Sequence, residues 1–177
     1  NTEFDALVLS DYNKKIFNNG LAKKLIELAN SRGLPSVVDP KPANALSFCG
    51  ASLFRPNIKE AREITGCKRT DEETVVKTLY EMIRGKYVAV TCGKKGIACY
   101  NGNEFAEIPT KVREIVDVTG AGDTVCAAMT LGLISGLDLF EAAHLGNYAA
   151  SVVVEKYGTS IVTKEELIER IKEDDDF

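Results

Sequence analysis

The segment from Val116 to Ala128, VDVTGAGDTVCAA, places two glycines and a carboxylate between an apolar run and a run of small residues. Glycines at the start of a helix let the backbone come close to a ligand, and the free amides of the first turn favour an anion. Asp123 would lie in that first turn, where the helix dipole stabilises a carboxylate even without a function. The segment is therefore a candidate site for handling an anion.

Three interpretations of this segment compete: a phosphate-binding loop whose acid serves as a base, a dinucleotide-binding loop, and a helix start capped by Thr119. The dinucleotide fingerprint G-x-G-x-x-G/A requires Gly or Ala at position 125, where the chain has Val125. A Walker loop requires a following Gly-Lys-Ser/Thr, which this segment lacks. The phosphate loop and the plain helix cap both remain open on local sequence.

The elements that must position this segment alternate between strands and helices. Strands are predicted over residues 6–9, 35–38, 52–54, 87–91, 97–100 and 104–108, and helices over 18–32, 58–65, 71–84, 120–135, 139–155 and 164–172. This order predicts an α/β fold with a doubly wound, mostly parallel sheet, helices on both faces and an antiparallel hairpin addition. Ligands of such sheets bind beyond the carboxyl ends of the strands, where Asp11, Asp39, Lys41 and Asn57 are expected.

Composition indicates an ordinary globular domain of 177 residues with 45% hydrophobic residues and a net charge of -4. A mildly acidic chain without a Lys/Arg cluster gives no support for a nucleic-acid partner, and no apolar run approaches a membrane span. The five cysteines are an odd number and form no Cys-x-x-Cys motif. We interpret them as reduced thiols of a cytoplasmic protein.

The residues Asp117-Val118-Thr119-Gly120-Ala121-Gly122-Asp123 resemble the D-x-T-G-A-G-D signature of the ribokinase/PfkB family of carbohydrate kinases. The resemblance implies a ribokinase-like fold and ATP-dependent phosphoryl transfer to a hydroxyl of a sugar or sugar phosphate. It assigns the amides of Gly120, Ala121 and Gly122 to an anion hole and Asp123 to the catalytic base. Phosphoryl transfer needs this kind of positioning and charge stabilisation more than covalent help.

A second motif, Pro56-Asn57-Ile58-Lys59-Glu60, matches the N-x-x-E motif with which the family helps to hold Mg2+ and phosphate, partly through water. The same spacing is also a capping box, with Asn57 as the N-cap and Glu60 at the third helical position. Both roles can hold at once.

Further candidates come from the same resemblance. Thr91-Cys92-Gly93-Lys94-Lys95-Gly96 is a glycine-rich turn similar to the family's T-x-G-x-x-G segment, so Thr91, Gly93 and Gly96 are candidate ATP contacts. Asn147, on a helix whose pattern otherwise indicates a core position, is a candidate neighbour of the adenine.

A monovalent-cation loop is the last of these candidates. The family resemblance assigns it to Asp117, Thr119 and Gly158, with K+ as the expected ion.

Two segments narrow the resemblance to the kinase domain of the bacterial heptose-7-phosphate kinases. Ser10-Asp11-Tyr12-Asn13-Lys14 is similar to S-D-Y-x-K-G, with Lys15 in place of the glycine. Val38-Asp39-Pro40-Lys41 is similar to V-D-P-K-G, with Pro42 in place of the glycine. By this resemblance Lys41 reaches the ATP phosphates; the alternative is a solvent-exposed lysine. The expected substrate is a heptose 7-phosphate, and the alternatives are another sugar or nucleoside of the same fold, or a nucleotide-binding fragment without catalysis.

The resemblance extends over essentially all of residues 1–177 but matches only the C-terminal part of the family's fold. We therefore expect one partial kinase domain that carries the nucleotide site, without the N-terminal part that holds the lid and most sugar contacts. Loss of neighbouring strands exposes a sheet edge, so self-association or a homodimer through that edge is a further expectation.

Overall fold

The computed structural model describes residues 3–68, 70–112 and 114–174. The strands of its sheet are β1 (Leu7–Ser10), β2 (Ser36–Asp39), β3 (Leu53–Phe54), β4 (Tyr87–Thr91), β5 (Ile97–Tyr100) and β6 (Phe105–Ile108), and they pair in this order. β1 to β4 are parallel, whereas β5 and β6 are antiparallel to their neighbours. The predicted mostly parallel sheet with a hairpin addition is confirmed.

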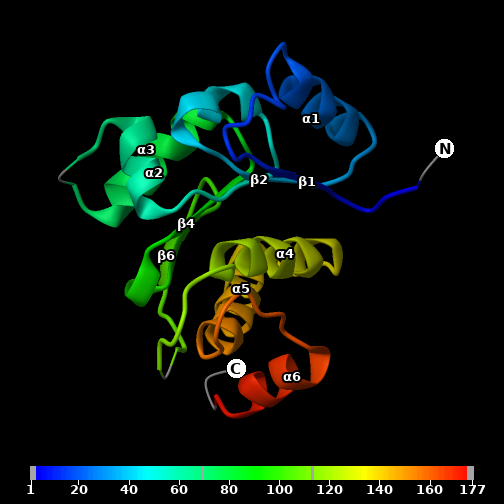
Figure 1. Cartoon of the computed structure of the whole chain (residues 1–177). Coiled ribbons are helices and arrows are strands. Elements are labelled where there is room, and N and C mark those ends of the chain that lie inside the picture. The colour runs from blue at the N-terminus through cyan, green and yellow to red at the C-terminus, as the bar shows by residue number, and fades with distance from the viewer. Residues whose placement is uncertain (1–2, 69, 113, 175–177) are drawn as a thin grey trace.

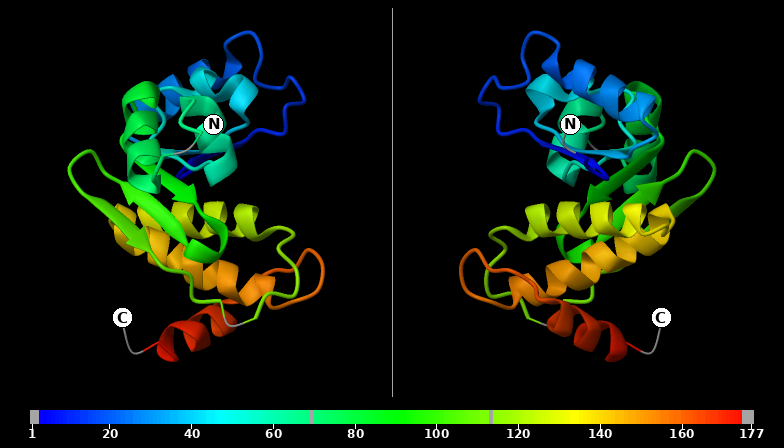
Figure 2. Two further views of the ribbon diagram at one scale, coloured as in Figure 1. Left: turned by 90° about the vertical axis from the view of Figure 1, so that its left-hand side faces the viewer. Right: turned by 90° about the vertical axis from the view of Figure 1, so that its right-hand side faces the viewer.

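Helices cover both faces of this sheet (Figures 1 and 2). One face carries α1 (Leu21–Ser31), the 3-10 helix η1 (Pro42–Phe48), α2 (Ile58–Thr65) and α3 (Glu72–Ile83); the other carries α4 (Ala121–Ile134) and α5 (Leu139–Val154), with α6 (Lys164–Lys172) against α5. The connections between the parallel strands thus all use one face, and the other face is covered after the last strand. Among the described helices, none has the length and apolar character needed to cross a bilayer.

The two faces of the strands supply two separate cores. Val38 and Phe54 pack with the helices of the first face, whereas the adjacent Val37 and Leu53 pack with α4 and α5. This alternation follows from the two-residue period of a strand, and it explains why the strands are apolar throughout.

The structure has a helix that was not predicted, and several bounds differ from the prediction by one to three residues, as at β3 and at α1, which begins at Leu21. The 3-10 helix η1 was not predicted, because a seven-residue segment beginning at Pro42 carries no helical periodicity. Ser52 lies outside β3, because its hydroxyl accepts from Ser36 N and its own amide donates to Ser36 Oγ, each at 3.1 Å. These side-chain bonds replace one rung of the ladder at the amino ends of β2 and β3.

The turn between β4 and β5 is held tightly at one of its two glycines. Gly96 has φ +98°, and a Cβ at this position would collide with the carbonyl oxygen of Ile108 and lie 2.7 Å from Thr110 N. Gly93 has φ +58°, but a Cβ there would meet nothing within 4 Å. The turn therefore needs glycine at 96 for space and at 93 only for conformation.

We predict that Gly96→Ala lowers the free energy of unfolding by at least about 3 kcal/mol, since backbone of the β6 end must move. The matched variant Gly93→Ala should cost only about 1 to 2 kcal/mol, the strain of a left-handed alanine. Urea denaturation followed by circular dichroism measures both values. Equal losses in the two variants would contradict the steric argument.

Candidate active site

The carboxyl ends of the four parallel strands lie side by side and bring polar residues from distant segments together. Asp11 follows β1, and its amide donates to the Asp39 carbonyl at the end of β2 at 2.8 Å. Asn57, two residues beyond Arg55 at the end of β3, forms an isolated parallel bridge with Thr91 at the end of β4. The strand-end residues expected from the sequence thus share one edge of the sheet.

A buried ion pair lies at the centre of this edge. Arg55 is 3% exposed, and its Nη2 lies 2.8 Å from Asp39 Oδ1. Burial raises the pKa of Asp39; the Arg55 cation opposes this rise, and the Glu60 carboxylate adds to it. Sequence reasoning did not single out Arg55, although a charged residue between a buried strand and Pro56-Asn57 was a usable signal.

Lys41, Glu60 and Asn57 form a second group at the start of α2. Lys41 Nζ lies 2.6 Å from Glu60 Oε1, while Glu60 Oε2 accepts from Asn57 N at 2.9 Å. Asn57 Oδ1 in turn accepts from the amides of Lys59 and Glu60, which confirms the predicted capping box. The hydrogen bond to Glu60 raises the pKa of Lys41, so this lysine is a paired cation rather than a free surface residue.

These contacts bear on how a Mg2+ ion could be held. Both carboxylate oxygens of Glu60 and the amide oxygen of Asn57 already accept hydrogen bonds. The described residues contain no group of three or more His, Cys, Asp or Glu side chains that could enclose a metal ion. The two side chains therefore fit a hydrated cation that they contact through water, which is the way Mg2+ is commonly bound beside phosphates.

The start of α4 exposes backbone amides. Gly120 is the N-cap with φ +83°, and no side chain caps this helix. Thr119 Oγ1 donates instead to Asp117 Oδ1 at 2.7 Å, so the interpretation of Thr119 as a helix cap is wrong. Ala121 N donates to the Val118 carbonyl at 3.2 Å.

Three further amides of this turn have no such partner. Within the described part of the chain, no backbone carbonyl or capping side chain accepts from Gly120 N, Gly122 N or Asp123 N. Free amides at a positive helix end are an anion-binding arrangement. The anion hole expected at Gly120, Ala121 and Gly122 remains a prediction, and the geometry leaves Gly120, Gly122 and Asp123 as free donors.

Asp123 is exposed at this helix start, and one side chain reaches it from the segment that follows β1. The hydroxyl of Tyr12 lies 3.2 Å from each carboxylate oxygen of Asp123, and Tyr12 is 60% exposed. The two residues are 111 positions apart, so no local pattern could have predicted their contact. Asp123 is thus accessible, oriented and close to the free amides, as a base for a bound hydroxyl would have to be.

The glycine-rich turn Thr91 to Gly96 closes through a hydrogen bond of 2.7 Å from Cys92 N to Gly96 O. Asn147 supports the wall behind this turn, because its buried Nδ2 donates to the carbonyls of Ile108 at 3.0 Å and Pro109 at 3.2 Å. Asn147 thus lies near the turn but has a structural use. Its role beside an adenine stays a prediction.

The three residues assigned to a cation loop also meet. Asp117 accepts from Thr119 and, through Oδ2, from Gly158 N at 3.1 Å, across 41 residues of chain. The Thr119 hydroxyl, followed by the Thr119 and Gly158 amides, lowers the pKa of Asp117. The carboxylate therefore stays ionised and ties the segment before α4 to the loop between α5 and α6.

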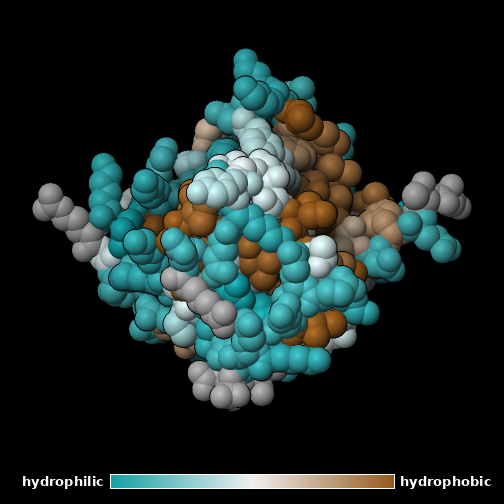
Figure 3. Space-filling view, turned by 60° about the horizontal axis from the view of Figure 1, so that its bottom comes forward, coloured by the Kyte–Doolittle hydropathy of each residue, from teal (hydrophilic) through white to brown (hydrophobic). Residues whose placement is uncertain are grey.

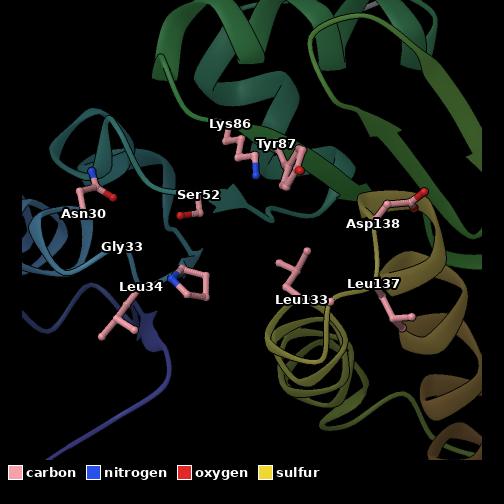
Figure 4. A pocket seen from close by; sticks show the side chains of 11 residues that line it. Asn30, Gly33, Leu34, Ser52, Lys86, Tyr87, Leu133, Leu137 and Asp138 are labelled. Carbon is pink, nitrogen blue, oxygen red and sulfur yellow. The ribbon is translucent and has the colours of Figure 1, made fainter.

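Another concave surface lies at the amino ends of the strands, on the opposite side of the sheet from the residues above (Figure 4). It is lined by residues at the amino ends of the strands, such as Leu34, Ser52 and Lys86, and by Leu133 and Asp138 around the α4–α5 connection. Asp138 caps α5, and Lys86 Nζ lies 4.7 Å from the Tyr87 ring centroid. None of the sequence-predicted site residues lines this pocket.

An α/β sheet with paired charges at its carboxyl edge and free amides beside a carboxylate defines a protein built to position an anion for proton or phosphoryl chemistry. Comparison with known proteins agrees with this class. The model of the pfkB family carbohydrate kinases matches residues 1–166. The chain belongs to the pfkB family of carbohydrate kinases.

Curated relatives include two proteins named bifunctional protein HldE. The one from Helicobacter hepaticus is 37% identical over 172 residues, and the one from Syntrophotalea carbinolica is 41% identical over 171 residues. The alignments cover 96% and 94% of this chain but only 36% and 35% of the relatives. The chain thus spans about a third of their length.

Solved structures share the fold. The ribokinase of Thermotoga maritima superposes with a TM-score of 0.79 at 27% identity, covering 95% of this chain and 57% of that chain. The Arabidopsis thaliana ribokinase complexed with ribose and ATP gives 0.78 at 23% identity, over 95% and 56% of the two chains. The phosphofructokinase-2 of Escherichia coli in complex with potassium gives 0.77 at 22% identity, over 87% and 52%.

We predict that Thr119→Val raises the pKa of Asp117 toward its ordinary value, because the largest cause of its depression is removed. A carboxylate with a depressed folded pKa stabilises the fold above its unfolded pKa, and this contribution disappears as the pH falls through the folded pKa. The stability difference between wild type and variant should therefore be present at neutral pH and vanish well below about pH 4.

Carboxyl-carbon NMR titration and thermal unfolding at several pH values measure these effects. The control is Thr124→Val, whose hydroxyl donates to the Gly120 carbonyl at 3.0 Å and does not touch Asp117. A rise in the pKa of Asp117 in the control, or none in Thr119→Val, would contradict this account.

Proposed function

We propose that this chain carries the nucleotide site and the base of an ATP-dependent kinase that phosphorylates a hydroxyl of a sugar or sugar phosphate. The observation that carries the proposal is the meeting of free amides at Gly122 and Asp123 with the exposed Asp123 carboxylate, at the sheet edge that also holds Lys41. Membership of the pfkB family of carbohydrate kinases supports the same activity.

Three groups of this site have separate roles in phosphoryl transfer. The amides of the α4 start hold the phosphoryl group that is transferred, and their dipoles stabilise its charge without reorganisation. Asp123 accepts the proton of the attacking hydroxyl as the new P–O bond forms. Lys41, paired with Glu60 at 2.6 Å, exchanges that partner for a phosphate oxygen of the nucleotide.

Cations belong to this proposal as well. Bound Mg2+ would neutralise phosphate charge, and Asn57 and Glu60 would hold its hydration shell. We assign K+ to the loop of Asp117, Thr119 and Gly158; the complex of E. coli phosphofructokinase-2 with potassium supports an ion of this kind in the fold.

For the acceptor we propose a heptose 7-phosphate. The support is the likeness of the segments around Tyr12 and Lys41 to the heptose-7-phosphate kinases, together with relatives named HldE at 37% and 41% identity. We also propose a cytoplasmic location, which the five free cysteines support.

Self-association completes the proposal. β1 is an edge of the sheet, and exposed apolar side chains include Val8 on β1, at 47%, and Leu131 and Ile134 on α4. Figure 3 shows hydrophobic areas among the hydrophilic surface of the face it turns forward. An unpaired strand edge with such neighbours favours association.

A second candidate function is nucleotide binding without transfer. The observation that favours it is coverage: the alignment with T. maritima ribokinase spans 57% of that protein, so the sugar contacts of a complete kinase could lie outside the matched part. In this case the chain binds ATP but phosphorylates no acceptor.

The test uses the 177-residue chain with ATP, Mg2+ and a panel of acceptors: heptose 7-phosphate, ribose, fructose 6-phosphate and adenosine. We predict saturable ATP binding by calorimetry and transfer to the heptose 7-phosphate. Asp123→Asn should lower the transfer rate at least about 100-fold because the base is lost, and should change ATP affinity less than about twofold.

The matched control is Asp138→Asn, a carboxylate that caps α5 at the opposite side of the sheet from the carboxyl ends of the strands. It should leave both transfer and binding unchanged. Binding without transfer to any acceptor would favour the second candidate, and a folded chain without ATP binding would contradict both. Full activity of Asp123→Asn would remove Asp123 from the role of base.

A further inference from the structure

Arg55 has no role in the assignments above, yet it occupies the space beneath the α4 start. A Cβ built on Gly122 would lie 3.6 Å from Arg55 Nη2 and 3.7 Å from Nη1. The guanidinium therefore lies close beneath the first turn of α4, which presents the free amides. It comes from the end of β3, so it lies between the sheet and α4.

The charge of Arg55 is only partly compensated. Asp39 Oδ1 accepts from Nη2 at 2.8 Å, but Nε is buried and has no hydrogen-bond partner among the described residues. On the α4 side the guanidinium lies near the Cys126 thiol. Burial raises the pKa of this thiol, and the Arg55 cation opposes part of the rise. Asp39 is itself mostly buried, with 16% of its side chain exposed, and this burial raises the pKa of its carboxyl group.

A buried cation that pairs with a single carboxylate adds little to the stability of a fold. Removing an arginine–carboxylate pair in favour of neutral residues often costs nothing, because the desolvation of both charges is avoided. Here the cation also lies against a helix N-terminus, whose partial charge is positive as well. Two positive ends placed together are unfavourable; the Asp39 carboxylate offsets part of this cost, and a bound anion would offset more.

We propose that Arg55 is a positioning residue for the terminal phosphoryl group of a bound nucleoside triphosphate. Its side chain fixes the distance between the first turn of α4, at Gly122, and the sheet. Its buried charge raises the positive potential at the free amides. This inference rests on the proposed kinase function, since it needs a terminal phosphoryl group at the α4 start. It makes Arg55 a determinant of preference for a triphosphate over a diphosphate.

The test compares ATP and ADP affinity, each with Mg2+, by calorimetry on the 177-residue chain. Arg55→Met should weaken ATP binding about tenfold, the usual weight of a lost charge-assisted interaction, and ADP binding less than about twofold. Arg55→Lys keeps the charge and should retain most of the ATP preference. A purely structural role would lower both affinities alike.

Arg170→Met is the matched control. Arg170 also pairs a mostly buried guanidinium with a carboxylate, because its Nη1 lies 3.0 Å from Glu155 Oε1 between α5 and α6. Its loss should reduce thermal stability without changing the ratio of ATP to ADP affinity. If Arg55→Met does not fold, the double variant Arg55→Met/Asp39→Asn replaces it, since it leaves no buried charge unpaired.

The outcomes separate this inference from the proposed function. Wild-type binding of ATP with an unchanged affinity ratio in folded Arg55 variants overturns the role of Arg55 alone. An equal loss of preference in Arg55→Lys and Arg55→Met overturns the role of its charge. Absence of ATP binding by folded wild type overturns the proposed function, and this inference with it.

Discussion

The parallel pairing of β1 to β4 is the constraint on which the rest of the structure depends. Parallel strands all end at one edge, so the residues that follow them meet there however far apart they are in the chain. Asp11, Asp39, Arg55 and Thr91 each occupy such a position. The register that pairs Ser10 with Asp39 and Val38 with Phe54 sets their relative heights. The α4 start lies at this edge as well, where the hydroxyl of Tyr12 contacts Asp123.

The α4 start has no side-chain cap, a feature that it shares with α1, which begins after Gly20. α2, α5 and α6 each have a complete capping box, whereas α4 begins at Gly120 without any side-chain cap. The nearest hydroxyl, on Thr119, is turned to Asp117 instead. The α4 start differs from the α1 start in having a carboxylate, Asp123, in its first turn beside the free amides, which are donors for an anion.

The charged side chains at the carboxyl ends of the strands are also arranged around the expected anion. Two ion pairs lie there, one between Lys41 and Glu60 and the other between Arg55 and Asp39. Each pair holds a cation near the place where an anion is expected, while the carboxylate limits the cost of burying or crowding positive charge. Such pairs contribute little to folding but preorganise the field into which a phosphate would enter. Stability is supplied elsewhere, by the two apolar cores on either side of the sheet.

Much of the architecture was determined by the sequence alone, because it depends on interactions between near neighbours. The continuous apolar runs of the strands and the spacing of Asn57 with Glu60 and of Thr163 with Glu166 are local patterns, and the bounds of α2, β4, β5 and α6 follow from them. The glycine pattern from Gly120 to Gly122 likewise predicted a helix start with free amides. The 3-10 helix η1 was not predicted, because its seven residues show no helical periodicity of apolar side chains.

What only the tertiary structure decided is which distant side chains complete the site. Tyr12 reaches Asp123, Arg55 pairs with Asp39 beneath Gly122, and Asn147 is used to hold the Ile108 and Pro109 carbonyls. These contacts join different strands and helices, so no spacing along the chain encodes them. The choice of Asp117 over α4 as the partner of the Thr119 hydroxyl is of the same kind. It depends on the loop around Gly158, 41 residues away, which holds that carboxylate in place.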